Sequence, residues 1–216
     1  MERIFDIESW DRKENYFFFK DFKEPFVGIT VELDATELVR ICKAKSMSIH
    51  HALLYCTISA ANQCLPMRLR RKDDGVIEHS TIDMGCAVMR EGTSAFTFAY
   101  YPWHEGDDAQ RFITRALEIT NKTAQGLPLE HRPDRTNLIY GTTLPWISFT
   151  SFTHPKKGGG HSIPRTVLGK IFNREGKDLL PFQLEVDHAL MDGIHMAQYF
   201  DVLQSELHKF NLEGLQ

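Results

Sequence analysis

The sequence predicts an α+β fold, a two-layer sandwich in which a mixed β-sheet carries helices packed on one face. Runs with β-forming alternation outnumber runs with helical periodicity, and the helical runs gather in a few segments instead of following every strand. The chain has 216 residues, of which 42% are hydrophobic, and this is enough for one sizeable core. We therefore expect a single domain over residues 1–216.

The first expected elements are one strand and two helices. Residues 26–33 alternate between the two faces and are rich in β-formers, which predicts a strand. Asp34 begins the capping box Asp-Ala-Thr-Glu, so a helix is expected to about residue 45. Ser48 begins a second, longer helix that ends near Cys64.

A hairpin and two strands are expected next. Residues 68–72 and 76–78 pair across the turn Asp-Asp-Gly, and residues 84–89 and 95–101 are further strands. The basic run at residues 68–72 is followed at once by two aspartates, so we interpret it as a solvated strand end.

The C-terminal half is expected to begin with a helix over residues 107–122, which has an acidic start. Three strands follow, at residues 146–153, 165–172 and 179–188. The glycine-rich residues 154–161 are expected to form a loop, and residues 193–209 a closing amphipathic helix.

Charge and cysteine content exclude several classes of protein. The formal net charge of -4 provides no field that would attract nucleic acid or an acidic membrane surface. The four cysteines show no Cys-x-x-Cys spacing, which favours a reduced, cytoplasmic compartment. The N-terminal residues are charged, so no signal peptide is expected, and no apolar run approaches the ~18 residues that span a bilayer.

The main candidate for chemistry is His188, where the last expected strand gives way to a turn. Histidine exchanges a proton near neutral pH, and a strand end holds a side chain firmly while leaving it accessible. Asp192 follows within one turn, and Gly193 is expected to provide backbone freedom for the entry into the helix. Taken alone, these residues equally fit a core histidine followed by a helix-capping aspartate.

The segment around His188 and three further stretches carry a resemblance to a known family. Residues 186–195, Val-Asp-His-Ala-Leu-Met-Asp-Gly-Ile-His, resemble the chloramphenicol acetyltransferase signature Val-His-His-Ala-Val-Cys-Asp-Gly-Phe-His. Residues 144–152 resemble that family's Leu-Pro-Trp-Val-x-Phe-x-Ser-Phe, which separates it from the dihydrolipoyl acyltransferase cores that share His-x-x-x-Asp-Gly. Residues 10–13, with the aromatics that follow, and residues 96–103 are similar to two more family segments. The matches keep their order over nearly the whole chain.

The resemblance implies a role for each matching residue. His188 corresponds to the general base, which takes the proton of an acceptor hydroxyl so that it attacks acetyl-CoA directly. Ser151 corresponds to the hydrogen-bond donor to the oxyanion. The remaining positions are a buried structural pair beneath the site (Arg12 and Asp192, with Gly193), acceptor-pocket aromatics (Phe18, Phe19 and Phe96) and a CoA-binding lysine (Lys170).

The resemblance also implies acetyl-CoA as co-substrate, a small hydroxyl-bearing acceptor, and no bound cofactor or metal. A homotrimer with sites at the subunit interfaces and a role in antibiotic resistance are implied in the same way. Neither nucleic acid nor a membrane is an expected partner.

Several positions depart from the family pattern. Asp187 replaces the first histidine of the pair, and strand alternation points it away from His188. Val167 stands where the family has a threonine, and Thr166, one residue off, faces the other way. Residues 153–161 and the pair Lys23-Glu24 make the expected acceptor pocket more polar than that of the family.

Three alternatives stay open. The acceptor is chloramphenicol or another hydroxyl compound, since acceptor choice depends on a few pocket contacts. A non-catalytic protein that binds a drug or CoA would keep the same fold. A metal protein would use histidines whose spacing fits no standard zinc pattern: His154, His161, His188 and His195.

Overall fold

The structure is a computed structural model that describes residues 1–73, 75–126, 128–129, 132, 134–155 and 162–210. Its strands are β1 (Glu2–Ile4), β2 (Phe26–Asp34), β3 (Leu69–Lys72), β4 (Gly75–His79), β5 (Asp83–Met89), β6 (Phe96–Tyr101), β7 (Leu138–Thr143), β8 (Arg165–Leu168), β9 (Phe172–Arg174) and β10 (Lys177–Asp187). Its helices are α1 (Lys13–Phe19), α2 (Thr36–Ala44), α3 (Ile49–Gln63), α4 (Leu65–Arg68), α5 (Ala109–Ala124) and α6 (Gly193–His208). No described helix is long and apolar enough to cross a membrane.

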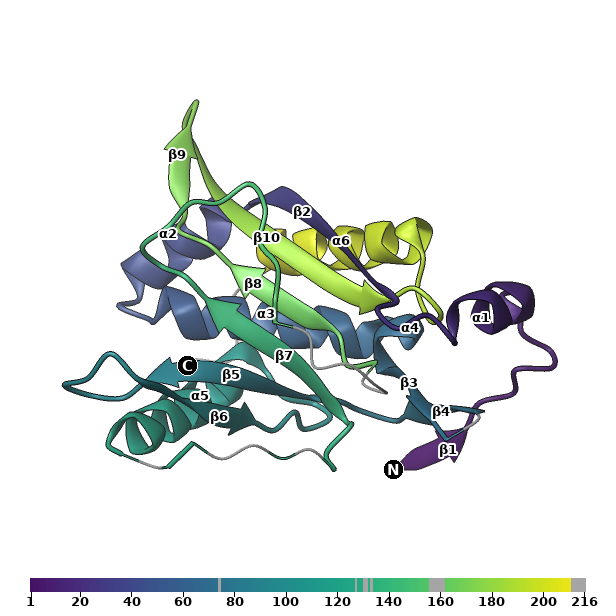
Figure 1. Cartoon of the computed structure of the whole chain (residues 1–216). Coiled ribbons are helices and arrows are strands. Elements are labelled where there is room, and N and C mark those ends of the chain that lie inside the picture. The colour runs from purple at the N-terminus through teal and green to yellow at the C-terminus, as the bar shows by residue number, and fades with distance from the viewer. Residues whose placement is uncertain (74, 127, 130–131, 133, 156–161, 211–216) are drawn as a thin grey trace.

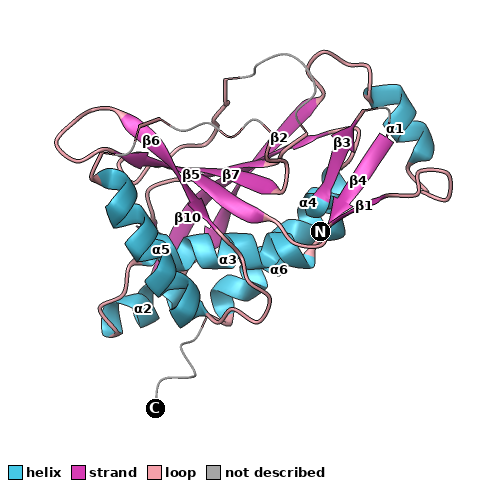
Figure 2. Cartoon of the chain, turned by 90° about the horizontal axis from the view of Figure 1, so that it is seen from below, coloured by secondary structure: helices cyan, strands magenta, loops and turns pink. Residues whose placement is uncertain are grey.

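The main sheet has seven strands in the order β2-β10-β8-β7-β5-β6, with β9 paired to β10 (Figure 1). β7 runs parallel to both β5 and β8, and the other pairs are antiparallel. Helices α2, α3, α5 and α6 lie on one side of this sheet (Figure 2). The predicted mixed sheet with helices on one face is therefore confirmed.

Strand β10 shows how alternation builds the two faces. Leu180, Phe182, Leu184 and Val186 belong to the apolar core. The residues between them, which include Gln183, Glu185 and Asp187, are also buried although they are polar. Because successive side chains point to opposite faces, the second face of the sheet must supply partners for these polar groups.

The expected strand at residues 146–153 is wrong. Strand β7 ends at Thr143, and the segment that follows is irregular. Pro145 cannot donate a ladder hydrogen bond, and the next two residues, Trp146 and Ile147, are 66% and 55% exposed. The apolar residues of this run therefore do not indicate a strand that is buried in a sheet. Strand β7 itself was not predicted.

Several elements differ from their expected bounds. The predicted capping box at Asp34 is wrong: helix α2 begins one residue later than expected, with Ala35 as its N-cap. Asp34 Oδ1 instead accepts hydrogen bonds from the backbone and hydroxyl of Thr36. The strand expected at residues 165–172 is divided into β8 and β9, and the short elements β1 and α1 were not predicted.

The predicted hairpin forms, but it belongs to a separate small sheet with the order β1-β4-β3. Its arginines are largely buried, contrary to our interpretation, whereas Lys72 at the end of the run is exposed. Arg70 is 1% exposed, and its guanidinium donates to the backbone carbonyls of Met67, Leu69, Thr136 and Leu138. The small sheet is thereby attached to the strand that begins at Leu138.

The cysteines behave as predicted for small buried thiols. Cys42, Cys56, Cys64 and Cys86 are all free and buried. The loop expected at residues 154–161 lies mostly outside the described residues, which include only its first two positions.

A buried histidine in α3 makes stability depend on pH. His51 is 5% exposed; its Nδ1 lies 2.7 Å from Ser48 Oγ and its Nε2 lies 2.9 Å from Thr120 Oγ1. Burial lowers the pKa of His51 to about 4. The unfolded chain therefore takes up a proton that the folded chain does not, and stability falls as pH drops from ~6.5 to ~4.

We predict that His51→Gln flattens this dependence. Glutamine retains one hydrogen bond but takes up no proton, so the slope of unfolding free energy against pH decreases by up to ~1.4 kcal/mol per pH unit in that window. Urea unfolding at several pH values measures the slope. The exposed His208→Gln is the control, and an unchanged slope in His51→Gln would contradict the prediction.

Candidate functional site

His188 lies directly after β10, and its ring is held on two sides. It stacks on Phe19 with ring centroids 4.1 Å apart and an interplanar angle of 20°. His188 Nδ1 lies 3.1 Å from the backbone carbonyl of Met191. A carbonyl can only accept, so Nδ1 donates, and in the neutral ring Nε2 is then the nitrogen that keeps its lone pair. The ring is thus fixed in the tautomer that a general base at Nε2 requires.

Arg12 supports the loop that carries His188. Its Nη2 donates to the His188 carbonyl at 3.0 Å, and its Nη1 donates to Asp192 Oδ2 at 3.1 Å. The pairing implied by the resemblance is therefore present. The side chain of Asp192 is, however, 41% exposed, so the expectation that the pair is buried holds only for Arg12.

Asp192 also begins helix α6. Its Oδ1 accepts from the backbone N–H of Gly193, and its own N–H donates to His195 Nδ1. The Gly193 N–H and the Arg12 guanidinium hold the pKa of Asp192 below its usual range. Asp192 is therefore an ionised support for the loop.

Glycine is not required at position 193, contrary to expectation. Among the described residues, no atom lies within 4 Å of where a Cβ would stand, and the backbone is outside the left-handed region. Helix α6 simply begins there, and Asp192 provides its cap.

Ser151 lies on the irregular segment after β7, and its side chain is exposed. This segment crosses the sheet face opposite the helices: Gln183 Nε2 donates to the Phe152 carbonyl, and His154 Nδ1 lies 2.7 Å from Glu185 Oε2. These contacts supply partners for the buried polar residues of β10. Within the described part of one chain, Ser151 and His188 share no hydrogen bond.

The three expected pocket aromatics do not come together in one chain. The ring of Phe18 is 65% exposed and contacts Phe19 edge to face, with ring centroids 4.8 Å apart. Phe19 is in turn the ring that stacks on His188. Phe96 is 48% exposed at the start of β6, the edge strand farthest from β2. Phe18 and Phe19 are thus on the His188 side, and Phe96 is at the other end of the sheet.

Lys170 contacts the family-like segment at residues 144–152. Its backbone N–H donates to the Ile147 carbonyl at 2.8 Å, and its side chain is exposed. Next to it, Phe149 packs against Gly169, where a Cβ would lie 2.9 Å from Phe149 Cε1. A side chain at position 169 would displace this aromatic ring.

Three of the histidines named for the alternative metal protein have other partners. His195 Nδ1 accepts from the Asp192 N–H. His154 contacts Glu185, and His188 contacts Phe19 and Met191. His161 lies outside the described residues. In the described ranges, no group of three or more His, Cys, Asp or Glu side chains could hold a metal ion.

The two departures near His188 are placed as predicted. Thr166 pairs in register with Leu184, on the core face, and Val167 pairs with Gln183, on the opposite face. Asp187 lies on the face away from the core, its side chain fully buried, with Oδ2 2.7 Å from Arg71 Nε. Burial raises the pKa of Asp187, and the charge of Arg71 opposes that rise.

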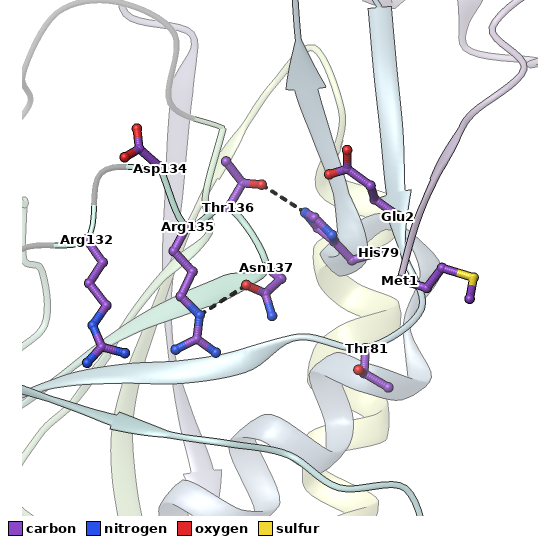
Figure 3. A pocket seen from close by; sticks show the side chains of 9 residues that line it. All are labelled: Met1, Glu2, His79, Thr81, Arg132, Asp134, Arg135, Thr136 and Asn137. Carbon is purple, nitrogen blue, oxygen red and sulfur yellow. Dashed lines mark hydrogen bonds between the residues drawn. The ribbon is translucent and has the colours of Figure 1, made fainter.

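A separate open cavity of about 620 Å³ lies between the start of the small sheet and the approach to β7 (Figure 3). Several of its polar side chains already have partners. His79 contacts Thr136, Arg135 donates to Asn137, and Arg132 lies over the ring of Tyr100. None of the predicted site residues lines it. We therefore place the candidate site at His188, not in this cavity.

Sequence reasoning missed one residue that supports the site, Arg71, and did not predict the stacking role of Phe19. Phe19 was expected in the acceptor pocket but not as the ring that stacks on His188. Arg71 was assigned to a solvated strand end. The acidic replacement at position 187 was the available signal for Arg71, because a buried carboxylate requires a cationic partner.

Comparison with known sequences matches nearly the whole chain to one family. The family model described as Chloramphenicol acetyltransferase matches residues 2–204. A chloramphenicol acetyltransferase from Proteus mirabilis is 25% identical over 202 residues, which cover 93% of this chain and 92% of that protein. Chloramphenicol acetyltransferase 3 from Escherichia coli is 24% identical over 204 residues, 93% and 94% of the two chains.

Solved structures agree with this. One chloramphenicol acetyltransferase superimposes with a TM-score of 0.84 and 29% identity, covering 96% of this chain and 100% of its own. A dihydrolipoamide acetyltransferase from Azotobacter vinelandii gives a TM-score of 0.69 at 16% identity, covering 91% of this chain and 86% of that one. At this identity, the second structure shows similarity of the fold alone.

Proposed function

The chain belongs to the chloramphenicol acetyltransferase family, and we propose that it moves an acetyl group from acetyl-CoA to the hydroxyl of a small acceptor, with His188 as general base. The observation that carries the proposal is the His188 ring, whose Nδ1 proton is committed to the Met191 carbonyl so that Nε2 is available. The family consists of acyltransferases, for which acetyl-CoA is the co-substrate.

The proposed reaction needs no acyl-enzyme. His188 Nε2 takes the proton of the acceptor hydroxyl while its oxygen attacks the thioester carbonyl. Ser151 Oγ–H donates to the oxyanion of the tetrahedral intermediate. Collapse breaks the carbon–sulfur bond, and the departing thiolate takes the proton from the imidazolium. Arg12 and Asp192 keep the loop in place, and Lys170 contributes to binding CoA.

We further propose a homotrimer in which His188 of one chain faces acceptor-pocket residues of the next. One feature supports this: Phe96, an expected pocket residue, lies on the edge strand β6, at the end of the sheet remote from the strand β2 that follows Phe18 in the chain. Light scattering after size-exclusion chromatography tests it. A monomer with full activity would contradict the shared site.

The identity of the acceptor is a separate part of the proposal. Chloramphenicol is the first candidate, and drug resistance the biological role that goes with it. A different acceptor is favoured by the polar second face of the sheet, where the His154–Glu185 contact lies two residues before the end of β10.

The deciding experiment measures thiol release from acetyl-CoA with chloramphenicol and with a panel of other hydroxyl compounds. We expect release that depends on the acceptor and on His188. Release with another acceptor alone would keep the reaction and change the substrate. Tight drug binding without any release would overturn the enzymatic proposal in favour of a binding protein.

We predict that Ser151→Ala lowers kcat about 10²–10³-fold, because one donor to a developing oxyanion contributes roughly 3–4 kcal/mol. The KM for acetyl-CoA is expected to change little. Ser148→Ala is a matched control, since Ser148 is an exposed serine in the same segment. Equal activity of the two variants would remove Ser151 from the proposed mechanism.

A further inference from the structure

Arg71 joins the two segments that hold the His188 ring. It projects from β3 of the small sheet, and its Nε forms an ion pair with Asp187 Oδ2 at 2.7 Å. Its Nη1 donates to the Lys20 carbonyl at 2.6 Å. Asp187 directly precedes the base, and Lys20 directly follows Phe19, which stacks on the base.

Asp187 in turn shapes the loop that orients the His188 ring. Its Oδ1 accepts from the backbone N–H of Ala189 at 2.9 Å. Its backbone carbonyl accepts from Leu190 at 2.9 Å and from Met191 at 3.0 Å. The carbonyl of Met191 is the group that His188 Nδ1 contacts. A shift of Asp187 would therefore displace the acceptor that selects the tautomer of His188.

Arg71 is itself firmly held. Its side chain is 15% exposed, and its backbone N–H donates to Ser162 Oγ at 2.8 Å. Residue 71 is paired with Val76 within the hairpin. The small sheet thus provides a rigid base from which one guanidinium reaches both segments.

Arg12 and Arg71 hold the loop from different elements. Arg12 contacts the His188 carbonyl and Asp192, at the end of the loop near α6. Arg71 contacts Asp187, at the end of the loop near β10. The Arg12 pairing matches the family pattern, whereas position 187 departs from it.

We propose that Arg71 is a positioning residue for the proposed acetyl transfer, which sets the orientation of His188 through Asp187 and the Lys20 carbonyl. The inference rests on the proposed function. Lysine at position 71 would keep the charge but lacks the planar guanidinium with its several donors. It can therefore contact either Asp187 or the Lys20 carbonyl, but not both.

The test compares Arg71→Lys and Arg71→Met with the wild-type chain. We expect kcat for CoA release to fall about 5–10-fold in Arg71→Lys and 10–100-fold in Arg71→Met, with the KM for acetyl-CoA within threefold. Arg3→Met is the matched control, because Arg3 lies on the same small sheet but its exposed side chain pairs with Glu78 and not with Asp187. If Arg71→Met does not fold, Arg71→Lys carries the test.

A second readout does not require turnover. In protein labelled with ¹⁵N-histidine, NMR shifts report which nitrogen of His188 is protonated, and His188→Gln assigns the signal. We expect the Nδ1-protonated signature in the wild type and its partial loss in Arg71→Lys. If kcat stays within twofold and the His188 signal is unchanged, Arg71 is merely structural and the inference is overturned, even if the variant is less stable. If the wild type releases no CoA with any acceptor, the proposed function fails, while the NMR comparison still decides the role of Arg71.

Discussion

Replacing His188 with glutamine is expected to lower the rate of CoA release about 10²–10⁴-fold. Glutamine can donate to the Met191 carbonyl as Nδ1 does, but it has no nitrogen lone pair that takes a proton near neutral pH. The acceptor hydroxyl would then have to attack without a base. A thiol-release assay at saturating acetyl-CoA and acceptor measures the effect.

The control for this experiment is His208→Gln, since His208 is an exposed histidine near the end of helix α6. Thermal unfolding of both variants checks that the fold is retained. If His188→Gln keeps more than a tenth of the wild-type rate, the proton of the acceptor is taken by another group and the proposed mechanism is wrong.

Arg70→Met is expected to lower the free energy of unfolding by roughly 3–5 kcal/mol. Methionine fills much of the same space, but it leaves the carbonyls of Met67, Leu69, Thr136 and Leu138 without the donors that Arg70 provides. Burial lowers the pKa of Arg70 to about 9, so the guanidinium is charged at neutral pH and these carbonyl dipoles take the place of a carboxylate. The loss of these four hydrogen bonds cannot be offset by a second substitution that removes the acceptors, because the acceptors are backbone carbonyls.

Urea unfolding measures this change, and we expect the midpoint to fall with the slope unchanged. Arg3→Met is again the control, because the Arg3 side chain is 76% exposed and its ion pair is expected to contribute at most ~1 kcal/mol. A loss of less than 1 kcal/mol in Arg70→Met would mean that the small sheet is attached mainly by other contacts.

The long, regular elements were predictable because their patterns are local. Ser48 caps α3 as predicted, and α6 begins at Gly193 as predicted. The irregular structure of residues 146–153 was not predictable, since aromatic and β-branched residues occur both in strands and in ordered loops that pack on a sheet. Proline at position 145 was the one local signal against a strand.

Part of the candidate site was equally readable from the chain. The position of His188 at the end of the last strand, and its link to Arg12 and Asp192, followed from spacing and from the family resemblance. Neither source indicated that Phe19 stacks on His188 or that Asp192 is partly exposed, because both depend on where helix α1 docks.

By itself, the sequence determined the fold class, the family and the identity of the residue that we propose as the base. Only the tertiary structure decided the tautomer of that base, since it depends on the Met191 carbonyl, and the partner of Asp187, since Arg71 is far away along the chain. Alternation and helical period specify which face a residue occupies. They specify neither the backbone conformation of the turn that places the Met191 carbonyl beside His188, nor the element that meets Asp187 when the two sheets pack.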